Sequence, residues 1–80
     1  MIDTNFLGRK IADARRHARL TQNDLAARVG VTAQAVSKWE QGRSCPDIAI
    51  LDEIADALGI SLFELLGVDD RGAATTEKNS

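Results

Sequence analysis

Only two residues, Gly30 and Val31, separate two stretches of helical periodicity, residues 21–29 and 32–41. A connection this short prevents two helices from running antiparallel, so they must cross steeply. The chain is therefore constrained to contain a sharp helical corner.

Three residue types are suited to such a corner. Ala26 is small where one helix crosses the other, Gly30 permits a positive φ, and Val36 fills the angle between the helices. The spacing Gln22-x3-Ala26-x3-Gly30-x5-Val36 is typical of a helix-turn-helix, although ordinary helical corners produce it too.

The rest of the chain also has helical spacing and lacks the alternation expected of strands, which predicts an all-α fold. Capping signals and glycines divide it into five helices, expected over residues 5–18, 21–29, 32–41, 47–58 and 61–66. The inward stripe of the first should be Leu7, Ile11, Ala14 and Ala18. We expect one domain over residues 1–67 and a flexible C-terminal tail over residues 68–80.

The composition argues against catalysis. A chain of 80 residues has room for one small core and not for a large cleft. Its single cysteine, Cys45, and single histidine, His17, exclude an internal disulfide and a structural zinc site within the chain. We therefore expect no enzyme, no metal and no cofactor, and no small-molecule ligand is evident.

The charge is divided along the chain. Residues 1–43 hold eight Lys/Arg against four Asp/Glu, whereas residues 44–80 hold two against eight. The basic first part and the acidic second part are either solvated faces or the DNA-facing and outward sides of a nucleic-acid-binding protein. No apolar run reaches membrane-spanning length and no secretory signal is present, so a cytoplasmic location is expected.

From Leu7 to Gly67 the chain resembles the lambda-repressor and Cro-like (XRE) family of helix-turn-helix proteins. The resemblance is carried by Leu20-Thr21-Gln22-x2-Leu25-Ala26, Gly30-Val31-Thr32-x3-Val36-Ser37-Lys38-Trp39-Glu40-x-Gly42, Pro46, and Leu51-x2-Ile54-Ala55-x2-Leu58-Gly59. It implies a five-helix DNA-binding domain whose second and third helices form the helix-turn-helix.

The resemblance also implies site residues. The third helix would enter the major groove, with DNA base contacts from Thr32, Ala33, Gln34, Ser37 and Lys38. DNA phosphate contacts would come from Gln22, Gln41 and Arg43. The alternative is an ordinary polar helix face. The remaining basic side chains of the first helix and its end are either phosphate ligands or solvated side chains: Arg9, Lys10, Arg16, His17 and Arg19.

Three residues have structural interpretations. Related domains pair an arginine and a glutamate at the positions of Arg15 and Glu40, so a half-buried ion pair is expected here. Arg19 stands where the family usually has a glycine, which predicts a positive φ at an arginine.

The function implied is a sequence-specific regulator of transcription that binds double-stranded DNA, a repressor acting by operator occupancy. Such proteins usually bind inverted repeats as homodimers. The apolar residues available for a dimer surface, unless they complete the core, are Ile50, Leu62, Phe63 and Leu66. The alternatives are an antitoxin or immunity regulator that also binds a partner protein, and a protein-interaction module without DNA binding.

Overall fold

The computed structural model describes residues 3–67, which form five α-helices and, within that range, no strand. The helices are α1 (Thr4–His17), α2 (Gln22–Val29), α3 (Ala33–Glu40), α4 (Ile48–Leu58) and α5 (Leu62–Leu66). The all-α, five-helix prediction is confirmed. The expected tail, residues 68–80, lies outside the described residues.

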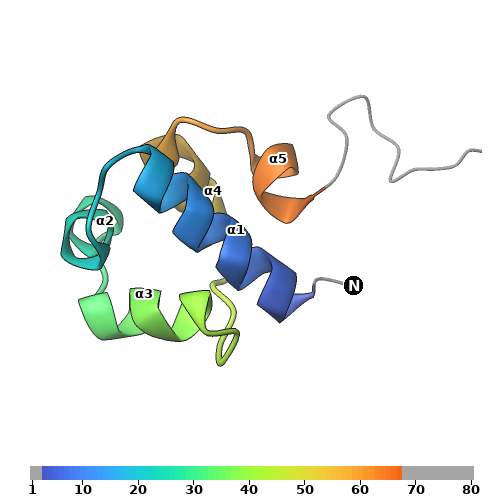
Figure 1. The fold of residues 1–80 in the computed structure, drawn as a ribbon, viewed down its shortest axis with the longest axis horizontal. Helices are drawn as coiled ribbons and strands as arrows, with labels where there is room; N and C mark the ends of the chain where they lie inside the picture. The colour runs from blue at the N-terminus through green and yellow to red at the C-terminus, as the bar shows by residue number, and fades with distance from the viewer. Residues whose placement is uncertain (1–2, 68–80) are drawn as a thin grey trace, which may run out of the picture.

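The helices pack around α1, which contacts α3, α4 and α5. Figure 1 shows α1 crossing the front of the molecule with α4 behind it, while α3 lies along one edge and α5 at the other end. α2 packs against both α3 and α4. α3, the helix expected from the sequence to enter the major groove, therefore packs on α1 and α2, and its outer side is free of contacts with the other helices.

Each helix begins on a side chain that accepts a hydrogen bond from a free backbone N–H of the first turn. These N-caps are Asp3, Thr21, Thr32, Asp47 and Ser61. Caps of this kind stabilise a helix by about 1 kcal/mol. These caps explain why the helix boundaries predicted from the sequence lie within one residue of the observed ones.

The capping box at α2 is complete. Asp24 N–H donates to the Thr21 hydroxyl at 3.0 Å, and Thr21 N–H donates to the Asp24 carboxylate at 2.9 Å. The bonds from Thr21, led by its backbone N–H, lower the pKa of Asp24. At α5, where Ser61 and Glu64 have the same spacing as Thr21 and Asp24, only the first half of such a box forms, from Glu64 N–H to the Ser61 hydroxyl.

The predicted bounds of α1, about residues 5–18, differ from the observed ones by one residue at each end. The helix starts one residue earlier because Asp3 caps it, and it ends at His17. Ala18 is the C-cap and is exposed, so it does not extend the buried stripe. Instead Gly8 and Ala12 are buried beside Leu7 and Ile11.

The core joins all five helices. Its buried members are Leu7, Ile11, Leu25, Ala26, Val29, Val36, Trp39, Leu51, Ile54, Ala55, Leu58 and Leu65. The four residues proposed for a dimer surface divide: Ile50, Leu62 and Leu66 pack partly buried against this core, and only Phe63 is exposed.

Gly8 lets α1 touch the end of α3 directly. A Cβ atom there would lie 2.8 Å from the Glu40 carbonyl oxygen and closer still to that of Trp39. Both obstacles are backbone atoms, so no side chain can rotate away. The close approach of α1 and α3 thus depends on the missing side chain.

We expect Gly8→Ala to destabilise the protein by about 2 kcal/mol, because the methyl group overpacks the helix contact. Helix propensity alone predicts the opposite, a gain of about 1 kcal/mol. Urea unfolding measures the difference, with His17→Ala at an exposed α1 position as the control. A more stable Gly8→Ala protein would show that the contact is not restrictive.

Arg19 has φ 61°, as predicted, and is the one residue other than glycine with a positive φ in the described range. The left-handed residue closes α1, because Leu20 N–H then donates to the Arg15 carbonyl at 3.1 Å. An arginine in this conformation costs about 1 kcal/mol that a glycine does not.

Arg19→Gly should therefore raise the free energy of unfolding by about 1 kcal/mol. The matched control is Arg28→Gly, at an exposed position within α2, which should lower it by a similar amount. Chemical denaturation of both proteins tests the contrast. Destabilisation in both would mean that the α1 terminus is not strained.

Candidate nucleic-acid interface

The corner between α2 and α3 has the geometry that the sequence predicted. Gly30 adopts φ 82°, and its N–H and that of Val31 both donate to the Ala26 carbonyl, at 2.8 and 3.0 Å. Ala26 and Val36 are buried on the inner side of the crossing. The inner face of α3 is consequently packed against α2, and its outer face is left accessible to solvent.

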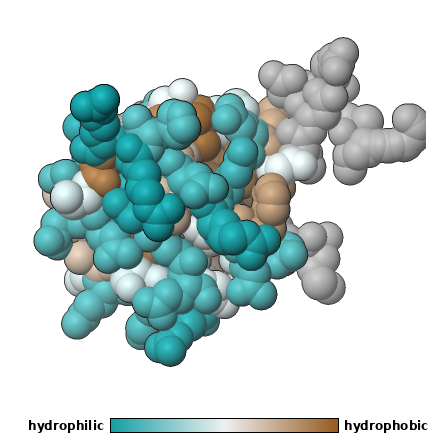
Figure 2. All heavy atoms as spheres, in the orientation of Figure 1, coloured by the Kyte–Doolittle hydropathy of each residue, from teal (hydrophilic) through white to brown (hydrophobic). Residues whose placement is uncertain are grey.

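The outer face of α3 carries the residues expected to contact bases. Thr32, Gln34 and Lys38 are exposed, while Ala33 and Ser37 are half-buried. The Thr32 hydroxyl also accepts a hydrogen bond from Ala35 N–H at 3.1 Å, which fixes the start of the helix. Figure 2 shows a predominantly hydrophilic surface over this edge of the molecule.

The turn after α3 is tied to the helix. Gly42 has φ 74°, and Arg43 N–H donates to the Lys38 carbonyl at 2.9 Å. The Gln41 amide donates to the Ser37 hydroxyl at 2.8 Å. Gln41 and Arg43, two of the expected phosphate ligands, are both exposed just after the end of α3.

The expected ion pair between Arg15 and Glu40 is present. Arg15 Nε lies 2.6 Å from Glu40 Oε2, and Arg15 NH2 donates to Glu40 Oε1 at 3.1 Å. The two side chains are only 12% and 8% exposed. The hydrogen bond to Glu40 raises the pKa of Arg15, which remains charged.

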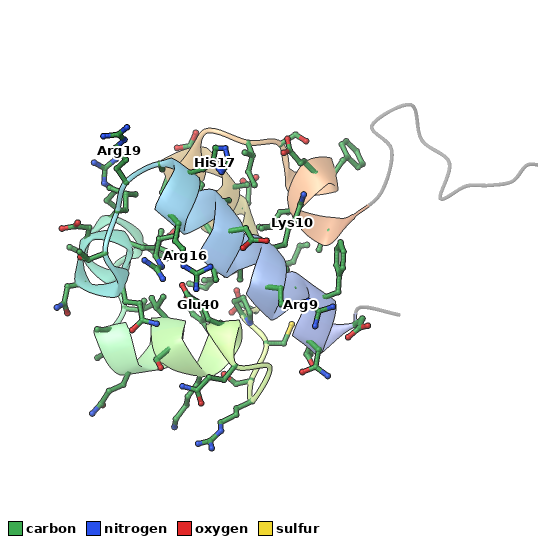
Figure 3. The ribbon with its side chains drawn as sticks, in the orientation of Figure 1. Arg9, Lys10, Arg16, His17, Arg19 and Glu40 are labelled. Carbon is green, nitrogen blue, oxygen red and sulfur yellow. The ribbon has the colours of Figure 1, made fainter. Side chains whose placement is uncertain are left out.

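This pair also anchors the neighbouring elements. Arg15 NH1 donates to the Leu20 carbonyl at 2.8 Å, in the turn before α2. The Gln22 amide donates to Glu40 Oε1 at 3.0 Å. Figure 3 shows Glu40 lying between α1 and α3, so one carboxylate joins three helices.

Sequence reasoning missed two of these features. Gln22 was expected only as a phosphate ligand, yet in the free protein its amide is half-buried and bound to Glu40. Gly8 was not singled out. Neither had a sequence signal in this chain, because the partners of both lie on α3, far along the sequence.

The described residues contain no group of three His, Cys, Asp or Glu side chains placed to hold a metal ion. No helix among them is long and apolar enough to cross a membrane.

The profile of the helix-turn-helix family matches residues 11–65 of the chain, more than half of its length. The chain belongs to the helix-turn-helix family. The match includes all of α2, α3 and α4.

Named relatives agree with the helix-turn-helix assignment. An HTH-type transcriptional regulator of Sinorhizobium fredii is 41% identical over 65 residues, covering 81% of this chain and 84% of the relative. The CTXphi transcriptional repressor RstR of Vibrio cholerae is 36% identical over 58 residues, covering 72% of this chain and 52% of the relative.

Solved helix-turn-helix structures resemble the fold. The clp gene regulator ClgR of Corynebacterium glutamicum superposes with a TM-score of 0.78 at 26% identity, covering 82% of this chain and 70% of that one. The restriction-modification controller C.AhdI of Aeromonas hydrophila gives 0.75 at 27%, covering 79% and 96%. Together these findings support a DNA-binding regulator of transcription.

Glu40→Gln should destabilise the helix-turn-helix domain by about 3 kcal/mol, because it strands the buried charge of Arg15. Glu53→Gln, at an exposed position of α4, is the matched control and should change stability by less than about 0.5 kcal/mol. Thermal and urea unfolding measure both. Equal stability of the two variants would mean that the ion pair does not hold α3 in place.

Proposed function

We propose that this protein is a repressor that recognises a short operator in duplex DNA by inserting α3 into the major groove. The observation that carries the proposal is the exposed polar half of α3, which projects from a corner fixed on its inner side by Ala26 and Val36. A helix presented in this way fits the width of the groove.

The exposed side chains have the chemistry of direct readout. Gln34 can pair bidentately with the N6/N7 edge of adenine, and Lys38 can donate to guanine O6 and N7. The methyl group of Ala33 can contact a thymine methyl. Thr32 and Ser37 can donate to either kind of base edge.

Contacts to phosphates would fix the register of α3. Gln41 and Arg43 follow the reading face, and Gln22 stands at the start of α2, where N–H groups face outward. One N–H of the Gln22 amide is taken by Glu40, which leaves its second N–H for a phosphate oxygen.

We propose binding as a homodimer on an inverted repeat, with half-sites about 34 Å apart. Of the large apolar side chains in the described range, Phe6, Ile48 and Phe63 are the exposed ones. Phe63 therefore remains from the four sequence candidates. Ile48, on α4, was not among them and is the most exposed of the three, at 63%.

Repression by occupancy needs no chemistry, so we propose neither catalysis nor a cofactor. A protein with this role acts where the DNA is, which in a bacterium or an archaeon is the cytoplasm. An antitoxin or immunity regulator would use α3 in the same way and add a partner protein.

Selection from a random duplex library at about 100 mM salt tests the proposal. The intact protein should enrich an inverted repeat, because each of the two copies of α3 in a dimer contacts one half-site of the same sequence. Gln34→Ala/Lys38→Ala should lose the enrichment, since each bidentate contact contributes about 1–3 kcal/mol of discrimination.

The matched control is His17→Ala/Arg19→Ala. Like the test variant, it removes two exposed polar side chains, one of which is positively charged. It should enrich the same repeat as the intact protein. No enrichment by the intact protein would favour the protein-interaction module instead.

A further inference from the structure

A hollow adjoins the outer face of α3 on the side toward α1. It has a volume of about 380 Å³ and lies between α1, the start of α2 and the end of α3. Its polar lining includes Arg9 and Arg16 from α1, Gln22 from α2, and Ser37 and Gln41 from α3 and its C-cap. It is thus continuous with residues proposed to contact DNA.

Apart from Arg15, which is paired with Glu40, the basic side chains of α1 lie on two sides of the helix. Arg9 and Arg16 are seven residues apart, about two turns, so they share the side that faces this hollow. Lys10 and His17, also seven apart, line a different hollow with Leu58 of α4. Figure 3 shows Arg9 and Arg16 on the α3 side of α1 and Lys10 and His17 on the other side, with Arg19 beyond the end of the helix.

The hollow offers uncommitted hydrogen-bond donors. Ser37 accepts from Gln41 at 2.8 Å, which leaves the hydroxyl proton of Ser37 and one N–H of the Gln41 amide to donate elsewhere. Gln22 likewise retains one amide N–H beside its bond to Glu40. Two guanidinium groups and three neutral donors therefore surround one space.

Two carboxylates also line the hollow, and neither prevents an anion from entering. Glu40 is neutralised by Arg15 at 2.6 Å and accepts from Gln22. Asp13 lies 3.3 Å from Arg16, but both side chains are well exposed, at 73% and 65%. Exposed pairs of this kind are weak and exchange readily for another partner.

We propose that this hollow receives a phosphate of the DNA backbone, and that Arg9 and Arg16 are its cationic ligands. The proposal rests on the proposed function, because α3 must lie in the major groove for a backbone to pass the hollow. It assigns DNA contact to Arg9 and Arg16 and withholds it from Lys10, His17 and Arg19.

The test compares DNA affinity and its salt dependence for Arg9→Ala/Arg16→Ala and for Lys10→Ala/Arg19→Ala, in the full chain on its selected operator. Both double variants remove two positive charges, so they change the long-range field alike. Far-UV circular dichroism and thermal unfolding establish that both are folded.

Arg9→Ala/Arg16→Ala should lower affinity about tenfold per bound chain and reduce the slope of log K against log salt by about 1. The loss should be the same for operator and unrelated duplex DNA, because phosphate contacts carry no sequence information. Lys10→Ala/Arg19→Ala should keep the slope within about 0.3 of the intact protein.

Equal slopes for the two double variants would overturn the assignment, and operator binding lost only in Gln34→Ala/Lys38→Ala would leave the proposed function intact. Absence of DNA binding by the intact protein would overturn both.

A third variant is independent of folding defects in the arginine mutants. Asp13→Asn releases Arg16 and removes a negative charge, so it should tighten binding about threefold; unchanged or weaker binding would contradict the proposal.

Discussion

The bond between Arg15 and Glu40 decides where α3 lies. Glu40 is the last residue of α3 and Arg15 belongs to the last turn of α1, so the pair joins two helices that local signals place independently. Its burial makes the geometry demanding, because a guanidinium and a carboxylate removed from water must satisfy each other. Gln22 completes the arrangement by adding the start of α2.

Gly8 makes that bond geometrically accessible. With no side chain at this position, the α1 backbone approaches the carbonyls at the end of α3. The orientation of α3 is thus determined on its inner side, by one missing side chain and one ion pair that is largely shielded from solvent. On the outer face, the exposed Thr32 caps α3 through Ala35 N–H. Gln34 and Lys38 are exposed and take no part in this junction, so their chemistry is free to vary.

The sequence predicted what depends on neighbours along the chain. Capping residues such as Thr21 and Ser61, and the left-handed Gly30, act within a few positions, so pattern and spacing located the helices and the corner. Ala18 was misassigned because the apolar spacing continues to the C-cap, one residue beyond the end of α1, where the side chain is exposed. The Arg15–Glu40 pair was expected only through family resemblance. The hollow beside Gln22 depends on how three helices meet, and no local pattern encodes that.

Trp39 lies at this same junction, 7% exposed, with its carbonyl beside Gly8. The chain has no tyrosine and no second tryptophan, so the near-ultraviolet emission of the protein comes from this one indole. Its fluorescence is therefore a built-in optical probe of how α3 sits on α1. Because the indole is buried on the inner side of α3, a change in its emission on adding DNA would report a shift of the helix itself and not stacking on a base.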